Sequence, residues 1–188
     1  MDEIFEAEYQ ITPGRLVKIV SYFVIYLFVF LIVFIPIMVY SIEGEEFQAF
    51  IIMFLLLIIM VPILIGSWAY SPQKYVVSEK RIKIVRPINS ISIPLREITK
   101  VEDRAINPLK TVRLWANGGL FSLSGTYYNK TDGKFVMYAK NDNYVMIYAN
   151  KKYVLSPDEK ERFMIEVQNK LEKAGKRRGE GSNFFNSQ

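Results

Sequence analysis

Two long apolar stretches dominate the pattern of hydrophobic and polar positions. Residues 19–40 contain no charged side chain over 22 positions, and residues 47–70 contain none over 24. A helix needs about 20 apolar residues to cross a hydrocarbon core of about 30 Å. Neither stretch carries the polar stripe of a helix on the surface of a soluble domain. The pattern therefore predicts a two-helix transmembrane hairpin within residues 16–70; the alternative is a pair of very apolar core helices.

The residues that flank the two predicted spans indicate their orientation. Arg15 and Lys18 precede the first span, several bases follow the second, and the turn at 41–46 holds three acids and no base. Lysine and arginine near helix ends stay on the cytoplasmic side. Trp68 and Tyr70 close the second span, as interfacial aromatic residues do. We expect a multi-pass protein of the cell membrane with both termini in the cytoplasm.

Residues 1–15 alternate in polarity before the first span. Phe5, Ala7, Tyr9 and Ile11 are separated by Glu6, Glu8 and Gln10. A period of two is typical of a strand with one solvated face. Two interpretations follow: the segment is a frayed terminus outside any sheet, or it adds an edge strand to the later domain.

Residues 71–174 change to short alternating runs separated by turn signals such as Asn117-Gly118-Gly119 and Asp132-Gly133. Seven or eight short strands at close intervals are typical of an all-β sandwich or barrel. The runs that we interpret as strands lie at 74–79, 81–86, 91–95, 98–102, 111–115, 120–128, 135–139, 144–149 and 152–155.

A helical period replaces the strand pattern near the end of the chain. Ser156 fits an N-cap, with Pro157 and Glu159 at the first and third helical positions. Apolar residues then recur every four positions at Phe163, Val167 and Leu171. We expect an amphipathic helix that ends at Gly175, followed by a polar tail, 175–188, whose composition predicts disorder.

The order of about seven strands and one terminal helix resembles a pleckstrin-homology (PH) fold. Short motifs along the chain add to this likeness: Tyr75-Val76-Val77-Ser78, Ile82-Lys83-Ile84, Ile93-Pro94-Leu95, Gly118-Gly119-Leu120-Phe121 and Tyr153-Val154-Leu155-Ser156-Pro157. With these motifs, the sequence over about 16–174 resembles bacterial PH-like domain proteins, many of which carry two membrane helices before the domain. The resemblance implies a seven-stranded sandwich or barrel capped by a helix, in which Phe163 takes the place of the tryptophan of other PH domains. It implies a binding or assembly module and names no ligand.

The composition limits the reactions that the chain could catalyse and the ligands that it could bind. The sequence has no cysteine and no histidine, which removes disulfides, thiol nucleophiles, the commonest zinc ligands and the usual general base. No nucleophile–base constellation is apparent, so we predict no enzyme, cofactor or metal site. Residues 71–188 hold 22 Lys and Arg against 12 Asp and Glu. Such a surplus draws a tethered domain to anionic headgroups, and no nucleic-acid-binding motif accompanies it.

One group of basic residues is the candidate lipid-binding site. The alternative is that these residues form a solvated strand face and only set the membrane topology. The expected function is a membrane-anchored binding or scaffolding module that engages a protein partner or self-assembles at the inner face of the membrane. Anionic-lipid sensing, or an accessory role in a membrane transport or enzyme complex, is the alternative. The group comprises Lys74, Lys80, Arg81, Lys83 and Arg86.

Overall fold

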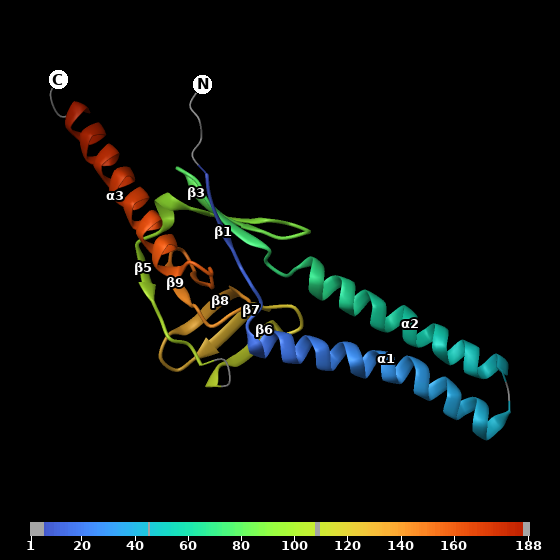
Figure 1. The fold of residues 1–188 in the computed structure, drawn as a ribbon. Helices are drawn as coiled ribbons and strands as arrows, with labels where there is room; N and C mark the ends of the chain where they lie inside the picture. Colours follow the sequence, from blue (N-terminus) through green and yellow to red (C-terminus); the bar gives the residue numbers. More distant parts are fainter. Residues whose placement is uncertain (1–5, 45, 108–109, 186–188) are drawn as a thin grey trace.

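The computed structural model describes residues 6–44, 46–107 and 110–185, with the backbone alone at 43 and from 175 onward. A helical hairpin projects from a domain of two sheets, and a long C-terminal helix covers that domain on the side away from the hairpin (Figure 1). The prediction of a membrane-type hairpin followed by a mainly β, PH-like domain is confirmed.

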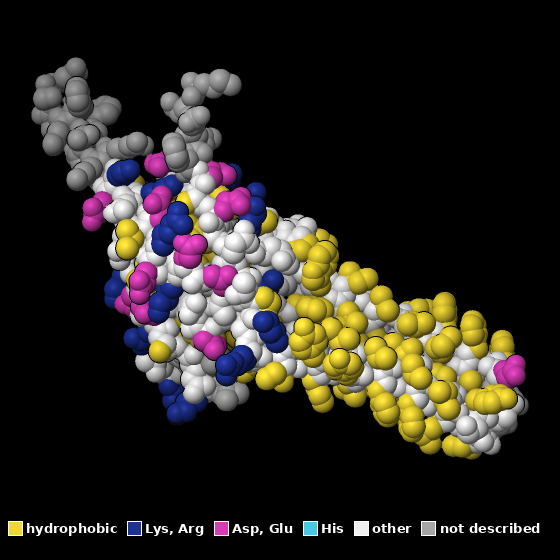
Figure 2. Space-filling view, viewed as in Figure 1, with side chains coloured by type: hydrophobic (Ala, Val, Ile, Leu, Met, Phe, Trp, Pro, Cys, Tyr) yellow, Lys and Arg dark blue, Asp and Glu magenta, His cyan; other side chains and the backbone are white. Residues whose placement is uncertain are grey.

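The hairpin consists of α1 (Arg15–Glu43) and α2 (Glu46–Ala69), which lie side by side. Gly44 ends α1 with a φ of 68°, and its N–H donates to the carbonyl of Tyr40 at 2.9 Å. By length and composition both helices can cross a membrane. Their most apolar stretches are unburied, and hydrophobic side chains cover the visible face of the hairpin (Figure 2). This exposure contradicts the alternative of two core helices.

The first sheet has four antiparallel strands in chain order: β1 (Ala7–Gln10), β2 (Lys74–Val77), β3 (Arg81–Val85) and β4 (Ile91–Pro94). Of the two interpretations of the N-terminal segment, the structure shows the edge strand, at Ala7–Gln10. It pairs with β2 so that Tyr9 lies opposite Tyr75. A segment that precedes the hairpin therefore completes a sheet that follows it.

The second sheet has six strands in the order β5-β9-β10-β8-β7-β6. All neighbours are antiparallel except β10 and β8, which are parallel. In the described part of the chain, nine strands follow Tyr70, and each overlaps one of the nine runs interpreted as strands, although the fold was expected to have seven or eight. The strands are β5 (Lys100–Asp103), β6 (Val112–Gly118), β7 (Leu123–Asn129), β8 (Gly133–Ala139), β9 (Val145–Tyr148) and β10 (Lys152–Leu155), with a short 3-10 turn, η1 (Leu95–Glu97), before them.

Two apolar clusters form the core. The first includes Tyr75 and Phe163, the latter on α3 (Lys160–Phe185), and the ring of Tyr9 packs edge-on against Phe163 with centroids 5.1 Å apart. The second joins Val17 of α1 to residues of the six-stranded sheet, Phe135 among them. The start of α1 is thus part of the domain core, which explains why this helix begins before the predicted span.

The predicted start and end of the C-terminal helix are wrong. The helix begins at Lys160, because Ser156 is buried and already bonded: its hydroxyl accepts the Lys140 N–H at 2.9 Å, and its own N–H donates to the Tyr75 hydroxyl at 2.9 Å. It also continues through Gly175 to Phe185 instead of ending there. A helical glycine costs only about 1 kcal/mol relative to alanine, and the neighbouring Lys and Arg favour helix. The last part of the tail predicted to be disordered, 186–188, lies outside the described residues.

Candidate functional site

The loop between β6 and β7 bonds the helical hairpin to the domain. The Ser21 hydroxyl on α1 accepts the Phe121 N–H at 2.8 Å and donates to the Gly119 carbonyl at 3.3 Å. The Ser71 hydroxyl, just after α2, donates to the Phe121 carbonyl at 3.2 Å. Phe121 has a φ of 62°, which is unfavourable for a bulky residue. One loop therefore holds the domain-proximal ends of both helices, and two cavities flank it.

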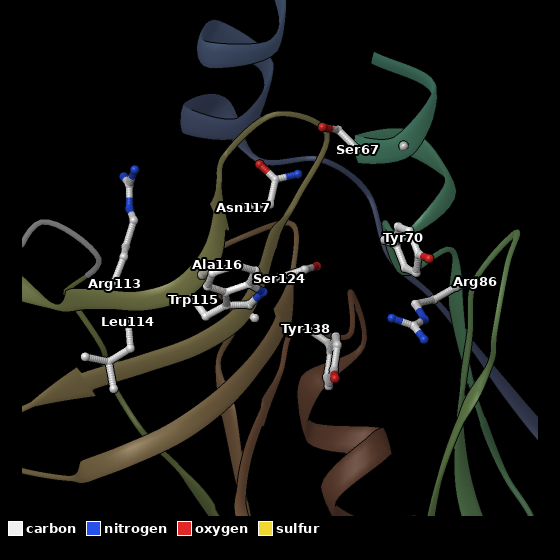
Figure 3. A pocket seen from close by; sticks show the side chains of 12 residues that line it. Ser67, Tyr70, Arg86, Arg113, Leu114, Trp115, Ala116, Asn117, Ser124 and Tyr138 are labelled. Atoms are coloured by element: carbon white, nitrogen blue, oxygen red, sulfur yellow. The ribbon is translucent and has the colours of Figure 1, made fainter. Parts of the chain in front are cut away.

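The larger cavity is an open groove of about 720 Å³ between the end of α2 and strands β6 and β7 (Figure 3). We call it the arginine groove. No carboxylate lies among its lining residues, whereas two arginines do. It is lined by Gly66, Ser67, Tyr70, Arg86, Arg113, Leu114, Trp115, Ala116, Asn117, Ser124, Gly125 and Tyr138.

The two arginines lie on opposite sides of the groove (Figure 3). The Arg86 guanidinium lies 5.5 Å from the ring centroid of Tyr70 and 5.7 Å from that of Tyr138, and its Nε donates to the Asn89 carbonyl at 2.9 Å. Arg113 packs over Gly118, where even a Cβ atom would collide with the guanidinium. A guanidinium held beside two aromatic rings, with a second arginine across the groove, suits an anionic or carboxylate-bearing ligand.

Strand β6 forms one wall of the groove and is also a free edge of the sheet, because it pairs only with β7. Val112, Leu114 and Trp115 on this edge are 60%, 53% and 86% exposed. The register shifts between Arg113 and Trp115, which is a β-bulge. An exposed edge of this kind presents unpaired N–H and C=O groups together with apolar side chains.

The five bases predicted to bind lipid do not share one environment. Lys74 forms an ion pair with Glu8 at 2.7 Å. Lys80 and Arg81 lie at the β2–β3 turn, at the end of these strands away from the hairpin, whereas Arg86 lies in the arginine groove. Lys83 faces the same side of the sheet as Lys74. Lipid binding by this group stays a prediction.

The predicted membrane-flanking residues lie at the ends of the hairpin nearest the domain. Arg15 and Lys18 are in the first turn of α1, while Trp68 and Tyr70 are at the end of α2 and half-exposed. Lys18 and Trp68 also line a second cavity of about 250 Å³, the junction cavity, which lies between α1, α2 and the end of β8. Its lining residues are Pro13, Val17, Lys18, Ser21, Tyr22, Ile25, Trp68, Ser71, Gln73, Phe121 and Lys140.

Sequence analysis missed Lys140, which follows β8 and is only 7% exposed. Its Nζ donates to Gln73 Oε1 at 3.4 Å, and burial lowers its pKa from the ordinary lysine value. A lysine between a strand and an Asn-Asp-Asn turn resembles any solvated loop residue, so no sequence signal marks it. It is buried because Gly14, at the start of α1, donates its N–H to the Lys140 carbonyl at 2.7 Å and brings the hairpin over it.

Among the described residues, no group of three or more Asp and Glu side chains could hold a metal ion. Beside the hairpin, the structure presents two cavities lined by cationic side chains and one exposed strand edge. These features are suited to binding.

The fold and the comparison with known families agree. The Bacterial PH domain family matches residues 73–171, more than half of the chain, and the chain belongs to this family. PH domains are typically non-catalytic. In this chain the domain follows two helices that are apolar enough to span a membrane. No curated protein and no solved structure matches the chain.

Proposed function

We propose that the protein is a membrane-anchored binding module that holds an extended segment of a protein partner at the cytoplasmic face of the membrane. The hairpin is the anchor, and the β6 edge with the arginine groove is the binding surface. The proposal rests on the exposure of Leu114 and Trp115 on the edge strand β6, beside the two arginines of the groove. A second copy of this chain is the other partner that the test can identify.

The anchor follows from the two exposed apolar helices. The most apolar stretches of both helices are unburied, so a bilayer accounts for their composition. The short acidic turn between them lies at the far end from the basic domain. Under the positive-inside tendency, the domain and both termini are cytoplasmic.

The binding mode follows from the edge and the groove together. A partner strand can pair with the backbone of β6 while its alternate side chains enter the neighbouring cavity. Apolar side chains would contact Leu114 and Trp115, and acidic ones would meet Arg86 and Arg113. Three large apolar side chains are exposed within four consecutive positions, and exposed apolar side chains gathered on one segment are typical of an interaction site. Because Ser67 and Tyr70 line the same groove, the partner segment would lie next to the membrane surface.

A photo-crosslinking amino acid at position 114 tests this function in intact cells. We expect it to yield a defined adduct with an apolar and acidic segment of one protein, or with this chain if the module self-assembles. The same crosslinker at Ile165, which is 58% exposed on α3, is the matched control and should not yield that adduct. Identical adducts from both positions, or none from position 114, would contradict the proposal. Release of the chain from membranes by alkaline carbonate would contradict the anchor.

A further inference from the structure

The junction cavity contains a buried cation without an anion. Lys140 is 7% exposed, and among the described residues its Nζ bonds to the neutral Gln73 at 3.4 Å. No carboxylate in the described part of the chain lies within 4.0 Å of its Nζ. A buried charge without a partner destabilises a fold, so lysines in such places usually pair with an anion.

A second buried lysine in the same protein shows the usual arrangement. Lys170 on α3 is 5% exposed, and its Nζ lies 3.3 Å from Glu166 and 3.7 Å from Glu79. The fold therefore supplies carboxylates where it buries a lysine within the domain. At Lys140 it supplies instead a cavity that also borders the hairpin.

The lining of the junction cavity combines two kinds of group. Lys18 and Lys140 supply two cations, with Gln73 as a further hydrogen-bonding group. Ile25 and Trp68, from α1 and α2, supply an apolar and aromatic wall, and Trp68 is exposed. At about 250 Å³ the cavity can take a headgroup, whereas acyl chains would have to lie outside it along the hairpin.

We propose that the junction cavity binds the phosphate of an anionic phospholipid in the adjacent leaflet, with Lys140 and Lys18 as its cationic ligands. A free phosphate ester shares this headgroup chemistry, but the apolar wall formed by Ile25 and Trp68 favours a ligand that carries acyl chains. The site rests on the membrane anchor of the proposed function and is independent of a partner at β6. It is also separate from the basic residues of the β2–β3 turn.

The test uses the purified full-length chain in a neutral detergent. Its melting temperature is followed while phosphatidylglycerol or phosphatidylcholine is added. We expect phosphatidylglycerol to raise the melting temperature and phosphatidylcholine not to. Replacing Lys140→Gln should raise the phosphatidylglycerol concentration at half-effect by about tenfold or more, because a charge-assisted hydrogen bond is lost. Lys134→Gln, an exposed position on β8, is the matched control and should respond as the unsubstituted chain does.

Two further variants keep the outcome decisive. Lys140→Arg should retain the response, since it keeps the cation. Lys18→Gln changes an exposed position, so it should fold even if Lys140→Gln does not, and its response should weaken in the same direction. If phosphatidylglycerol shifts the melting temperature equally in the unsubstituted chain, Lys140→Gln and Lys18→Gln, the proposal that the junction cavity binds the lipid phosphate is wrong.

Soluble phosphates separate the two sources of the ligand. Inorganic phosphate and glycerol 3-phosphate should stabilise the chain far less than phosphatidylglycerol at equal concentration. Equal stabilisation that is lost in Lys140→Gln would overturn the assignment to a lipid in favour of a soluble phosphate ester. A chain that stays in membranes after carbonate treatment but shows no phosphatidylglycerol response contradicts this site alone, whereas a chain that is released contradicts the anchor as well.

Discussion

The hydroxyl of Ser21 lies 2.8 Å from the backbone nitrogen of Phe121 and accepts its hydrogen bond across 100 positions of the sequence. Ser21 belongs to the first predicted span, and Phe121 lies in a loop of the β domain. The bond holds a residue with a left-handed backbone conformation against the base of the hairpin. Anchor and domain are therefore joined by specific polar contacts as well as by the chain connection at residues 70–73.

Removing that hydroxyl should destabilise the protein. In Ser21→Ala the Phe121 N–H loses its partner, which costs about 1–3 kcal/mol for a group that cannot reach water. Thermal unfolding in detergent measures the change. Ser41→Ala is the matched control, because this exposed hydroxyl bonds only to Ile37 within its own helix; its effect should stay within about 0.5 kcal/mol. Equal melting temperatures for the two variants would contradict a structural role for Ser21.

Phe163 should be the most sensitive position of the C-terminal helix. Its fully buried ring contacts the rings of Tyr9 and Tyr75, so it links α3 to both β1 and β2. Phe163→Ala should lower the free energy of unfolding by about 3–5 kcal/mol. Ile165→Ala, an exposed position on the same helix, should change it by less than about 0.5 kcal/mol. Chemical denaturation of the full-length chain in detergent compares the two variants. A small effect of Phe163→Ala would show that the core repacks around the smaller side chain.

Asp158 should control how firmly the N-terminal strand is held. Its carboxylate accepts hydrogen bonds from the Thr12 N–H, the Thr12 hydroxyl and the Asn141 amide, each at 2.9 Å. Asp158→Ala removes these bonds, so amide exchange in β1 should accelerate about tenfold.

Hydrogen–deuterium exchange by mass spectrometry measures this opening segment by segment. Amides of β8 should be unchanged, because they lie in the other sheet. Glu161→Ala, an exposed carboxylate three residues further along, is the control. Equal β1 exchange in both variants would mean that pairing with β2 alone holds the strand.

The stability of the domain should fall between pH 10 and pH 12 in part through Tyr127. Burial raises the pKa of Tyr127 to about 12, and its hydroxyl donates to the Asn117 carbonyl at 2.7 Å. In the unfolded chain the tyrosine pKa is about 10. The folded state therefore holds a proton that the unfolded state has released, and this contribution is present below pH 10 and is lost as pH rises to about 12.

Unfolding measured at several pH values tests the tyrosine prediction. Tyr127→Phe should lower stability at neutral pH by about 1 kcal/mol through the lost hydrogen bond. The same variant should lose less stability than the unsubstituted chain between pH 10 and pH 12. Parallel pH profiles would show that Tyr127 does not titrate on unfolding in this range.

Periodic features were predictable because each depends on local spacing. The apolar stretches predicted α1 and α2, and the alternation around Tyr9 predicted β1. Single polar residues were harder. Ser156 was interpreted as a helix cap, yet Tyr75 and Lys140, both distant in sequence, use its hydrogen-bonding groups. The parallel pairing of β8 with β10 also had no local signal, because it joins strands that are separated by β9.

In the candidate sites, too, local patterns were predictable and contacts between distant segments were not. Arg86 was predicted as part of a basic group, but its environment between Tyr70 and Tyr138 comes from three separate segments. Trp115 lies in the predicted strand at 111–115, and aromatic residues in strands usually pack within a sheet. It is exposed because β6 is an edge strand with a bulge, and strand order cannot be inferred from spacing alone.

By itself, the sequence determined that this protein has two helices suited to a membrane, a β domain with a capping helix, and no cysteine or histidine chemistry. These properties follow from composition and from periods of two and 3.6, which need no distant contacts. Only the tertiary structure decided that α1 begins inside the domain core, that Lys140 is enclosed beside the hairpin, and that β6 is left as an edge. Burial and pairing depend on which segments meet in space, and here the meeting segments lie about 100 or more positions apart, as with Ser21 and Phe121 or Gly14 and Lys140.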